Sequence, residues 1–179
     1  IFKHMDITVV VGYKAIEVVQ IHPNLNYVYN SNWQITNNSY SLSLALDENP
    51  CFVLSGDLFL DENLIDAMAD GAPNCLLTEK RENRELNSLN CILNEHQEIK
   101  ELYQGPRRHK EDPEAMGIYK ICNRDILRIW KKNCLEHPNL FCGQNLRFDI
   151  SPISSFDIGS LRLDEVNTVL DYLRIINNK

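Results

Sequence analysis

One acidic side chain closes the most apolar stretch of the sequence. Residues 51–57 read CFVLSGD, so an apolar run ends on Asp57. In open α/β sheets, ligands bind beyond the carboxyl ends of the strands, and a strand over 51–57 would place this carboxylate at that edge. A carboxylate removed from water needs compensation, which a divalent cation such as Mg²⁺ can supply. The alternative is an Asp that caps the following turn.

A second polar group precedes this strand. Residues 30–41 are rich in amides and hydroxyls, and Thr36, Asn37 and Ser41 lie where a helix over 39–46 should begin. The N-terminus of a helix presents free N–H groups and a partial positive charge, so it can hold a phosphate. Neutral amides and hydroxyls can also read base edges or sugar hydroxyls. Simple capping of the helix is the alternative.

The spacing of apolar residues predicts the elements that must position these groups. We expect an α/β fold, because strands alternate with helices in the first third of the chain, with a mainly parallel sheet and a small antiparallel hairpin excursion. The polar loop 105–115 is the best candidate for a mobile lid. The expected strands are 7–13, 26–30, 51–57, 74–80 and 116–121, the helices 14–22, 39–46, 61–71, 123–136 and 168–178, and the hairpin 88–103.

The composition fits one globular domain over residues 1–179, with 44% hydrophobic and 24% charged residues. A net charge of −7 argues against non-specific nucleic-acid binding, and no apolar run approaches the ~20 residues of a membrane span. No signal peptide is visible, and the six cysteines are scattered, so we expect buried thiols in a reducing cytoplasm. Cys134, His137 and Cys142 lie close together, but their spacing matches no standard zinc pattern.

Five segments, in chain order, resemble motifs of nucleotidyltransferases with a Rossmann-like core, the MobA-like NTP transferases. The segments are VVVGYKAIEV, NYVYNSNWQITNNSYSLSLAL, FVLSGDLFL, EAMGIYKIC and DEVNTVLDYLRI. They are most similar to the branch that acts on phosphocholine, aminoethylphosphonate or related acceptors, usually with CTP. The resemblance covers nearly the whole chain and implies a three-layer, Rossmann-like fold.

The resemblance also implies roles for individual residues. Asp57 would be the catalytic residue and the principal Mg²⁺ ligand, and Glu165 and Asn167 would provide a second metal contact. The phosphate oxygen that attacks is already anionic, so no general base is required, and the protein would act by positioning and charge neutralisation. A carboxylate beside the acceptor could face a cationic head group. The residues that would line the nucleotide or the acceptor are Asn30, Thr36, Asn37, Ser41, Glu114 and Gly117.

The sequence departs from the family pattern at three places. The Gly-rich phosphate loop is absent, so we expect that an N-terminal segment, including the first strand, is missing; a homodimer could cover the sheet face that this would expose. Asn167 stands where the family most often has Asp, which lowers the negative charge offered to a metal. Gln104 stands where the family often has Lys, and three basic residues that could substitute follow it: Arg107, Arg108 and Lys110.

The sequence therefore supports three hypotheses. The first is a Mg²⁺-dependent cytidylyltransferase that transfers CMP from CTP to phosphocholine, aminoethylphosphonate or a similar acceptor and releases pyrophosphate. The second is an enzyme of the same fold that uses another nucleotide and a sugar 1-phosphate. The third is a non-catalytic nucleotide-binding or interaction module, which the missing phosphate loop and Asn167 favour.

Overall fold

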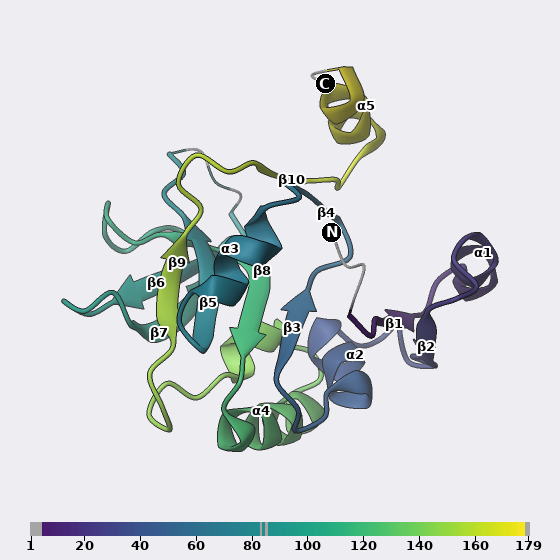
Figure 1. Ribbon diagram of the computed structural model, residues 1–179, viewed down its shortest axis with the longest axis horizontal. Helices are drawn as coiled ribbons and strands as arrows, with labels where there is room; N and C mark the ends of the chain where they lie inside the picture. The colour runs from purple at the N-terminus through teal and green to yellow at the C-terminus, as the bar shows by residue number, and fades with distance from the viewer. Residues whose placement is uncertain (1–4, 83, 85, 178–179) are drawn as a thin grey trace. The chain divides into compact units, whose positions relative to one another are not determined.

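The computed structural model describes residues 5–82, 84 and 86–177, and the fold divides into two compact units (Figure 1). Unit 1 contains Cys51–Cys122 and Pro152–Lys179, and unit 2 contains Phe2–Pro50 and Asn123–Ser151. Each unit is therefore built from two segments that are distant in the sequence. The prediction of a single domain stays a prediction.

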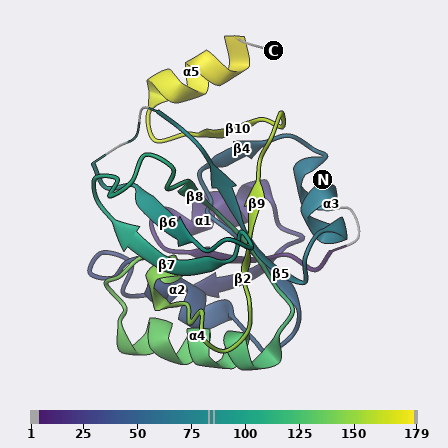
Figure 2. The same ribbon diagram turned by 90° about the vertical axis from the view of Figure 1, so that its left-hand side faces the viewer.

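A mixed sheet forms the centre of unit 1 (Figures 1 and 2). β8 runs antiparallel to both β3 and β5, and β9 runs parallel to β5, so β3, β5 and β9 share one direction. β6 and β7 form the expected hairpin. The α/β fold class is thus confirmed, with β8 reversed among strands of common direction. The strands are β3 (Cys51–Leu54), β5 (Asn74–Glu79), β6 (Leu89–Leu93), β7 (Ile99–Gln104), β8 (Glu114–Ile121) and β9 (Ser154–Asp157).

β8 changes its partner along one edge at Gly117. Glu114 pairs with β6, whereas Ile118 and the residues after it pair with β3. Gly117 has a φ of +71°, in the left-handed region that glycine adopts without steric cost, and its carbonyl oxygen accepts a hydrogen bond from Ser55 N at 3.0 Å. A Cβ atom at Gly117 would lie 2.7 Å from Ser55 Oγ. The glycine therefore lets two strands share the same edge of β8.

The helix α3 (Leu64–Asp70) packs its buried apolar residues on this sheet, and Lys120 of β8 holds its C-terminal end. Lys120 is buried, and its Nζ donates to the carbonyl oxygens of Met68, Ala69 and Gly71 at 3.0, 2.6 and 3.1 Å. A buried ammonium is costly unless its protons are bonded, and the C-terminus of a helix favours a cation. Lys120 thus joins α3 to the central strand.

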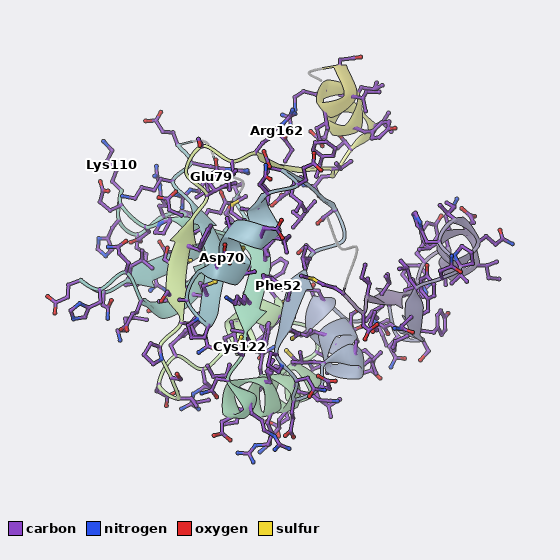
Figure 3. All side chains as sticks on the ribbon, viewed as in Figure 1. Phe52, Asp70, Glu79, Lys110, Cys122 and Arg162 are labelled. Carbon is purple, nitrogen blue, oxygen red and sulfur yellow. The ribbon has the colours of Figure 1, made fainter. Side chains whose placement is uncertain are left out.

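We expect replacement of Lys120 by Met to lower the free energy of unfolding by about 2–4 kcal/mol, because three carbonyl oxygens would lose their donor. Urea denaturation followed by circular dichroism measures the change. The matched control is Lys110→Met, at an exposed lysine (Figure 3), which should stay within ~0.5 kcal/mol of the parent. Equal stability of the Lys120 and Lys110 variants would contradict the structural role.

A short antiparallel pair, β4 (Leu58–Leu60) with β10 (Leu163–Glu165), forms a separate part of unit 1 and leads to helix α5 (Val169–Asn177). The prediction of a strand over 51–57 was wrong in its end: β3 stops at Leu54, because Ser55, Gly56 and Asp57 turn the chain into β4. Turn formation is what a Ser-Gly-Asp sequence favours. The predicted helix 168–178 is α5, and residue 178 lies outside the described residues.

Unit 2 contains a parallel pair, β1 (Thr8–Val11) and β2 (Asn26–Tyr29), which α1 (Ala15–Ile21) connects. The other elements of unit 2 are α2 (Asn38–Ala45), α4 (Arg124–Glu136) and the short 3₁₀ helix η1 (Cys142–Asn145). The four expected elements 14–22, 26–30, 39–46 and 123–136 are confirmed, with ends that differ by at most one residue. None of the described helices combines the length and the apolarity that crossing a membrane requires.

Candidate functional site

Two of the predicted metal ligands approach each other on the paired strands β4 and β10. Asp57 directly precedes β4, and Glu165 ends β10 opposite Leu58. The backbone of Val166 donates to Asp57 O at 2.8 Å, which extends the pairing to the aspartate itself. Asp57 is exposed, whereas Glu165 is half-buried. The antiparallel pairing therefore brings together two carboxylates from opposite ends of unit 1's sequence.

The pKa of Glu165 is raised by its surroundings, which include Asp57. Burial raises the pKa of Glu165, the charge of Asp57 raises it further, and the cation of Arg81 acts in the opposite direction. Two carboxylates that lie near each other can attract a divalent cation. The donors fit Mg²⁺, which proteins often bind through one or two carboxylates, with substrate phosphates and water completing its shell. Among the described residues, no cluster of three or more His, Cys, Asp or Glu could hold a metal ion.

Asn167 lies beside this pair but acts on it indirectly. It is exposed, and its Nδ2 donates to Glu165 Oε2 at 3.4 Å. This bond lowers the pKa of Glu165, against the larger effects of burial and Asp57. The amide thus orients the Glu165 carboxylate, and the binding of a metal by Asn167 itself stays a prediction.

We expect replacement of Glu165 by Gln to stabilise the protein near pH 7.5 and to leave its stability nearly unchanged near pH 4. Because the pKa of Glu165 is raised in the folded state, folded protein binds this proton more tightly than unfolded chain does. The free energy of unfolding therefore falls as the pH rises from 4.5, the ordinary pKa of a glutamate, through the raised pKa of Glu165 in the folded protein. Thermal melts of parent and variant at both pH values measure the difference.

The control for Glu165→Gln is Glu62→Gln, at an exposed glutamate before α3. This change removes the same charge without touching the carboxylate pair. An equal gain at both pH values in the Glu165 variant, or a loss near pH 7.5, would contradict the assignment.

A third acidic residue of the predicted site, Glu114, is partly buried and faces an arginine. Its Oε2 accepts no hydrogen bond from the described residues, and the Nε atom of Arg84 lies 3.8 Å away. Arg84 also donates to the carbonyl oxygens of Arg81 and Asp112 and to Asn90 Oδ1. Glu114 therefore has its charge offset within the protein, while it adds to the rise in the pKa of Glu165.

The loop expected to be a mobile lid is held in place by its own side chains. Tyr103 Oη donates to Asp112 Oδ2 at 2.6 Å, and both residues are buried. The Arg108 guanidinium lies 4.1 Å from the centre of the Tyr103 ring and pairs with Glu101 at 2.7 Å. Arg107 donates to the carbonyl oxygen of Lys110. Two of the basic residues expected to replace the family's Lys are thus bound within the protein.

The predicted polar ligands of unit 2 form one hydrogen-bonded group. Asn30 is buried; its Oδ1 accepts from Asn32 N, and its Nδ2 donates to Ser41 Oγ at 3.0 Å and to Thr36 Oγ1 at 3.4 Å. Asn37 caps α2, as the sequence indicated. These side chains fix the loop 30–36 against the start of α2. Their contact with a nucleotide or an acceptor stays a prediction.

Neighbouring polar residues hold a segment that sequence reasoning missed. Asn38 Oδ1 accepts from Cys142 N at 2.8 Å, and Asn145 Nδ2 donates to Ser39 Oγ at 2.7 Å. Asn37 N donates to Pro138 O at 2.9 Å. The start of α2 therefore binds the chain around η1, about a hundred residues away, and no local pattern in the sequence indicates this pairing.

The cysteines are unsuited to nucleophilic chemistry. Burial raises the pKa of Cys75 to about 11 and the pKa values of Cys91 and Cys134 to about 12. A thiol attacks as its thiolate, so these groups are unreactive near neutral pH. Cys142 is also buried, and Cys51 and Cys122 are partly buried.

Comparison with known proteins places the fold among nucleotidyltransferases. Neither the protein-family models nor the curated protein sequences give a match to this sequence. Solved structures, in contrast, do match this chain. The CTP:phosphocholine cytidylyltransferase from Streptococcus pneumoniae is similar over 97% of this chain and 78% of its own, with a TM-score of 0.75 and 15% identity. The inositol-1-phosphate CTP transferase from T. maritima is similar over 90% and 70%, with a TM-score of 0.65 and 16% identity.

A UTP-bound UGPase from Acinetobacter baumannii is also similar, over 91% of this chain and 63% of its own, with a TM-score of 0.64 and 11% identity. At such identities the likeness concerns the fold. The chain therefore has the Rossmann-like α/β fold that these nucleotidyltransferases share, as the resemblance of its motifs implied.

Proposed function

We propose that the protein is a nucleotidyltransferase that transfers CMP from CTP to a phosphorylated or phosphonate small molecule and releases pyrophosphate. The observation that carries the proposal is the pair Asp57 and Glu165: Asp57 directly precedes β4, Glu165 ends the paired strand β10, and the charge of Asp57 acts on Glu165. The fold supports it, since two similar structures are a CTP:phosphocholine cytidylyltransferase and an inositol-1-phosphate CTP transferase. Phosphocholine and aminoethylphosphonate are the acceptors that the motifs favour.

In this proposal Asp57 and Glu165 hold Mg²⁺, which when bound neutralises phosphate charge as the two anionic reactants meet. Asp57 is exposed and can reach an incoming ligand, while Asn167 orients the half-buried Glu165. The acceptor oxygen is already anionic, so positioning and electrostatic stabilisation suffice. In unit 2, Asn30, Thr36 and Ser41 form one hydrogen-bonded group and remain the proposed ligands of the nucleotide or the acceptor.

A second candidate is a transferase that uses another nucleotide and a sugar 1-phosphate, as the likeness to a UTP-bound UGPase suggests. The test is a pyrophosphate-release assay with Mg²⁺, in which CTP, UTP, GTP and ATP are each combined with phosphocholine, aminoethylphosphonate or glucose 1-phosphate. We expect release with CTP and the first two acceptors, and loss of release with EDTA.

The other results of the same assay decide between the remaining candidates. Release with UTP or GTP and glucose 1-phosphate would establish the second candidate. No release from any combination, together with nucleotide binding by calorimetry, would identify a non-catalytic module. A homodimer and a cytoplasmic location are part of the proposal, and light scattering and cell fractionation test them.

A further inference from the structure

Arg81 lies beside the carboxylate pair and is fixed there from two sides. It follows β5 by two residues; its Nε donates to Glu79 Oε2, and its Nη2 donates to Leu163 O at 3.2 Å. Leu163 lies on β10 two residues before Glu165. Figure 3 shows Glu79 and Arg162 at the same end of unit 1, where β5 ends and β10 begins. The guanidinium is therefore held against the strand that carries Glu165.

The fixed guanidinium keeps part of its hydrogen-bonding capacity unused. A guanidinium has five N–H groups in a planar fork, and two of them serve Glu79 and Leu163. No residue in the described part of the chain accepts a hydrogen bond from Nη1. The side chain is 28% exposed, so a ligand can reach it. An arginine fixed in this way is suited to a phosphate, because its fork matches two phosphate oxygens at once.

Three neighbouring arginines also donate to groups of the protein. Arg84 is nearly buried and donates from Nε, Nη1 and Nη2 to three acceptors. Arg107 donates to backbone carbonyl oxygens, and Arg108 pairs with Glu101. Arg81 combines a fixed position, partial exposure and a direct electrostatic effect on Glu165. It is therefore the cation best placed to meet an anion at Asp57 and Glu165.

We propose that Arg81 binds a phosphate or phosphonate oxyanion of the reactants through Nη1, with Glu79 and Leu163 O holding its guanidinium in place. The assignment of that anion to CTP or to the acceptor rests on the proposed function. The binding itself does not, since it follows from the geometry of Arg81. In the reaction, Arg81 would offset negative charge that the cation at Asp57 and Glu165 leaves uncompensated.

Two variants and a matched control test the proposal. Arg81→Met removes charge and fork, and Arg81→Lys keeps the charge alone. The control is Arg162→Met, which removes a neighbouring arginine that pairs with Asp164 at 2.6 Å. Because side chains alternate along a strand, Asp164 faces away from Glu165. Calorimetry measures the binding of CTP, pyrophosphate and aminoethylphosphonate separately, and electron paramagnetic resonance measures Mn²⁺ binding without nucleotide.

We expect Arg81→Met to weaken binding of at least one of the three anions tenfold or more, Arg81→Lys to fall between that variant and the parent, and Arg162→Met to match the parent. Mn²⁺ affinity should be unchanged or higher in Arg81→Met, because a cation beside two carboxylates is removed. The probes that lose affinity identify which reactant Arg81 binds.

The proposal would be overturned if Arg81→Met lowers the affinity for every anion less than tenfold, or if the parent protein binds none of the anions. It would also be overturned if Arg81→Met lowers Mn²⁺ affinity in parallel, because that result would indicate that Arg81 merely holds β10. The proposed function fails separately. If the parent protein binds anions through Arg81 but releases no pyrophosphate from any pair of substrates, the inference about Arg81 is retained and the proposed function is rejected.

Discussion

The Asp57→Asn variant should lose pyrophosphate release by about 10³-fold or more while it keeps the fold. Asparagine has nearly the same shape but no charge, so the site would lose half of its metal-binding carboxylate charge. Electrostatic stabilisation of a phosphoryl transition state supplies several kcal/mol, and each 1.36 kcal/mol changes the rate tenfold. Asp57 is exposed in a turn, and the paired atom there is its backbone oxygen, which the change leaves intact.

The experiment compares Asp57→Asn with Asp66→Asn, a matched change at an exposed aspartate of α3. Turnover, Mn²⁺ binding and thermal melting are measured for both. Asp66→Asn should match the parent in turnover, Mn²⁺ binding and melting temperature. Asp57→Asn should match the parent in melting temperature alone. Turnover by Asp57→Asn above a tenth of the parent rate would show that this carboxylate does not hold the metal.

The Gly117→Ala variant should unfold more easily by about 3 kcal/mol. An alanine at a φ of +71° costs roughly 1–2 kcal/mol, and forcing a methyl group into a filled space costs roughly 1–3 kcal/mol more. The new Cβ would lie 2.7 Å from Ser55 Oγ, at the point where β8 exchanges β6 for β3. Chemical denaturation measures the change.

Two comparisons separate the causes of this loss. Gly159→Ala introduces the same methyl group at a φ of +61° with no atom within 4 Å, so it should cost only about 1 kcal/mol. Adding Ser55→Ala to Gly117→Ala removes the closest atom, and about 1 kcal/mol should return. If Gly117→Ala costs no more than Gly159→Ala, then the contact with Ser55 is not important for stability.

Elements of seven residues or more were predictable from the sequence, because their apolar spacing and caps are local. The helix expected over 39–46, for example, is α2, which Asn37 caps. The strands β4, β9 and β10 were not predicted, because they form through pairing with distant strands. The end of β3 was misjudged for a similar reason, since Gly56 in a turn resembles a strand end in the sequence.

For the candidate site, the carboxylates were predictable and the arginines were not. Asp57 follows an apolar run, and the motif around Glu165 carries its own resemblance. Arg81 and Arg84 lie in a polar stretch that has the composition of a solvated loop. Their roles depend on hydrogen-bond acceptors that are distant in the sequence: Arg81 donates to Leu163 O, and Arg84 donates to Asp112 O. Only the folded arrangement reveals these partners.

The interleaved order of the two units has a consequence for synthesis. As the chain leaves the ribosome, residues 2–50 emerge before the segment 123–151 that completes their unit. The side chains of Asn38 and Ser39 then lack their partners Cys142 and Asn145 until those residues have been synthesised. Closing so long a loop slows folding and leaves apolar surface open to aggregation meanwhile. Nascent chains of this protein should therefore depend on chaperones until residues 123–151 have been translated.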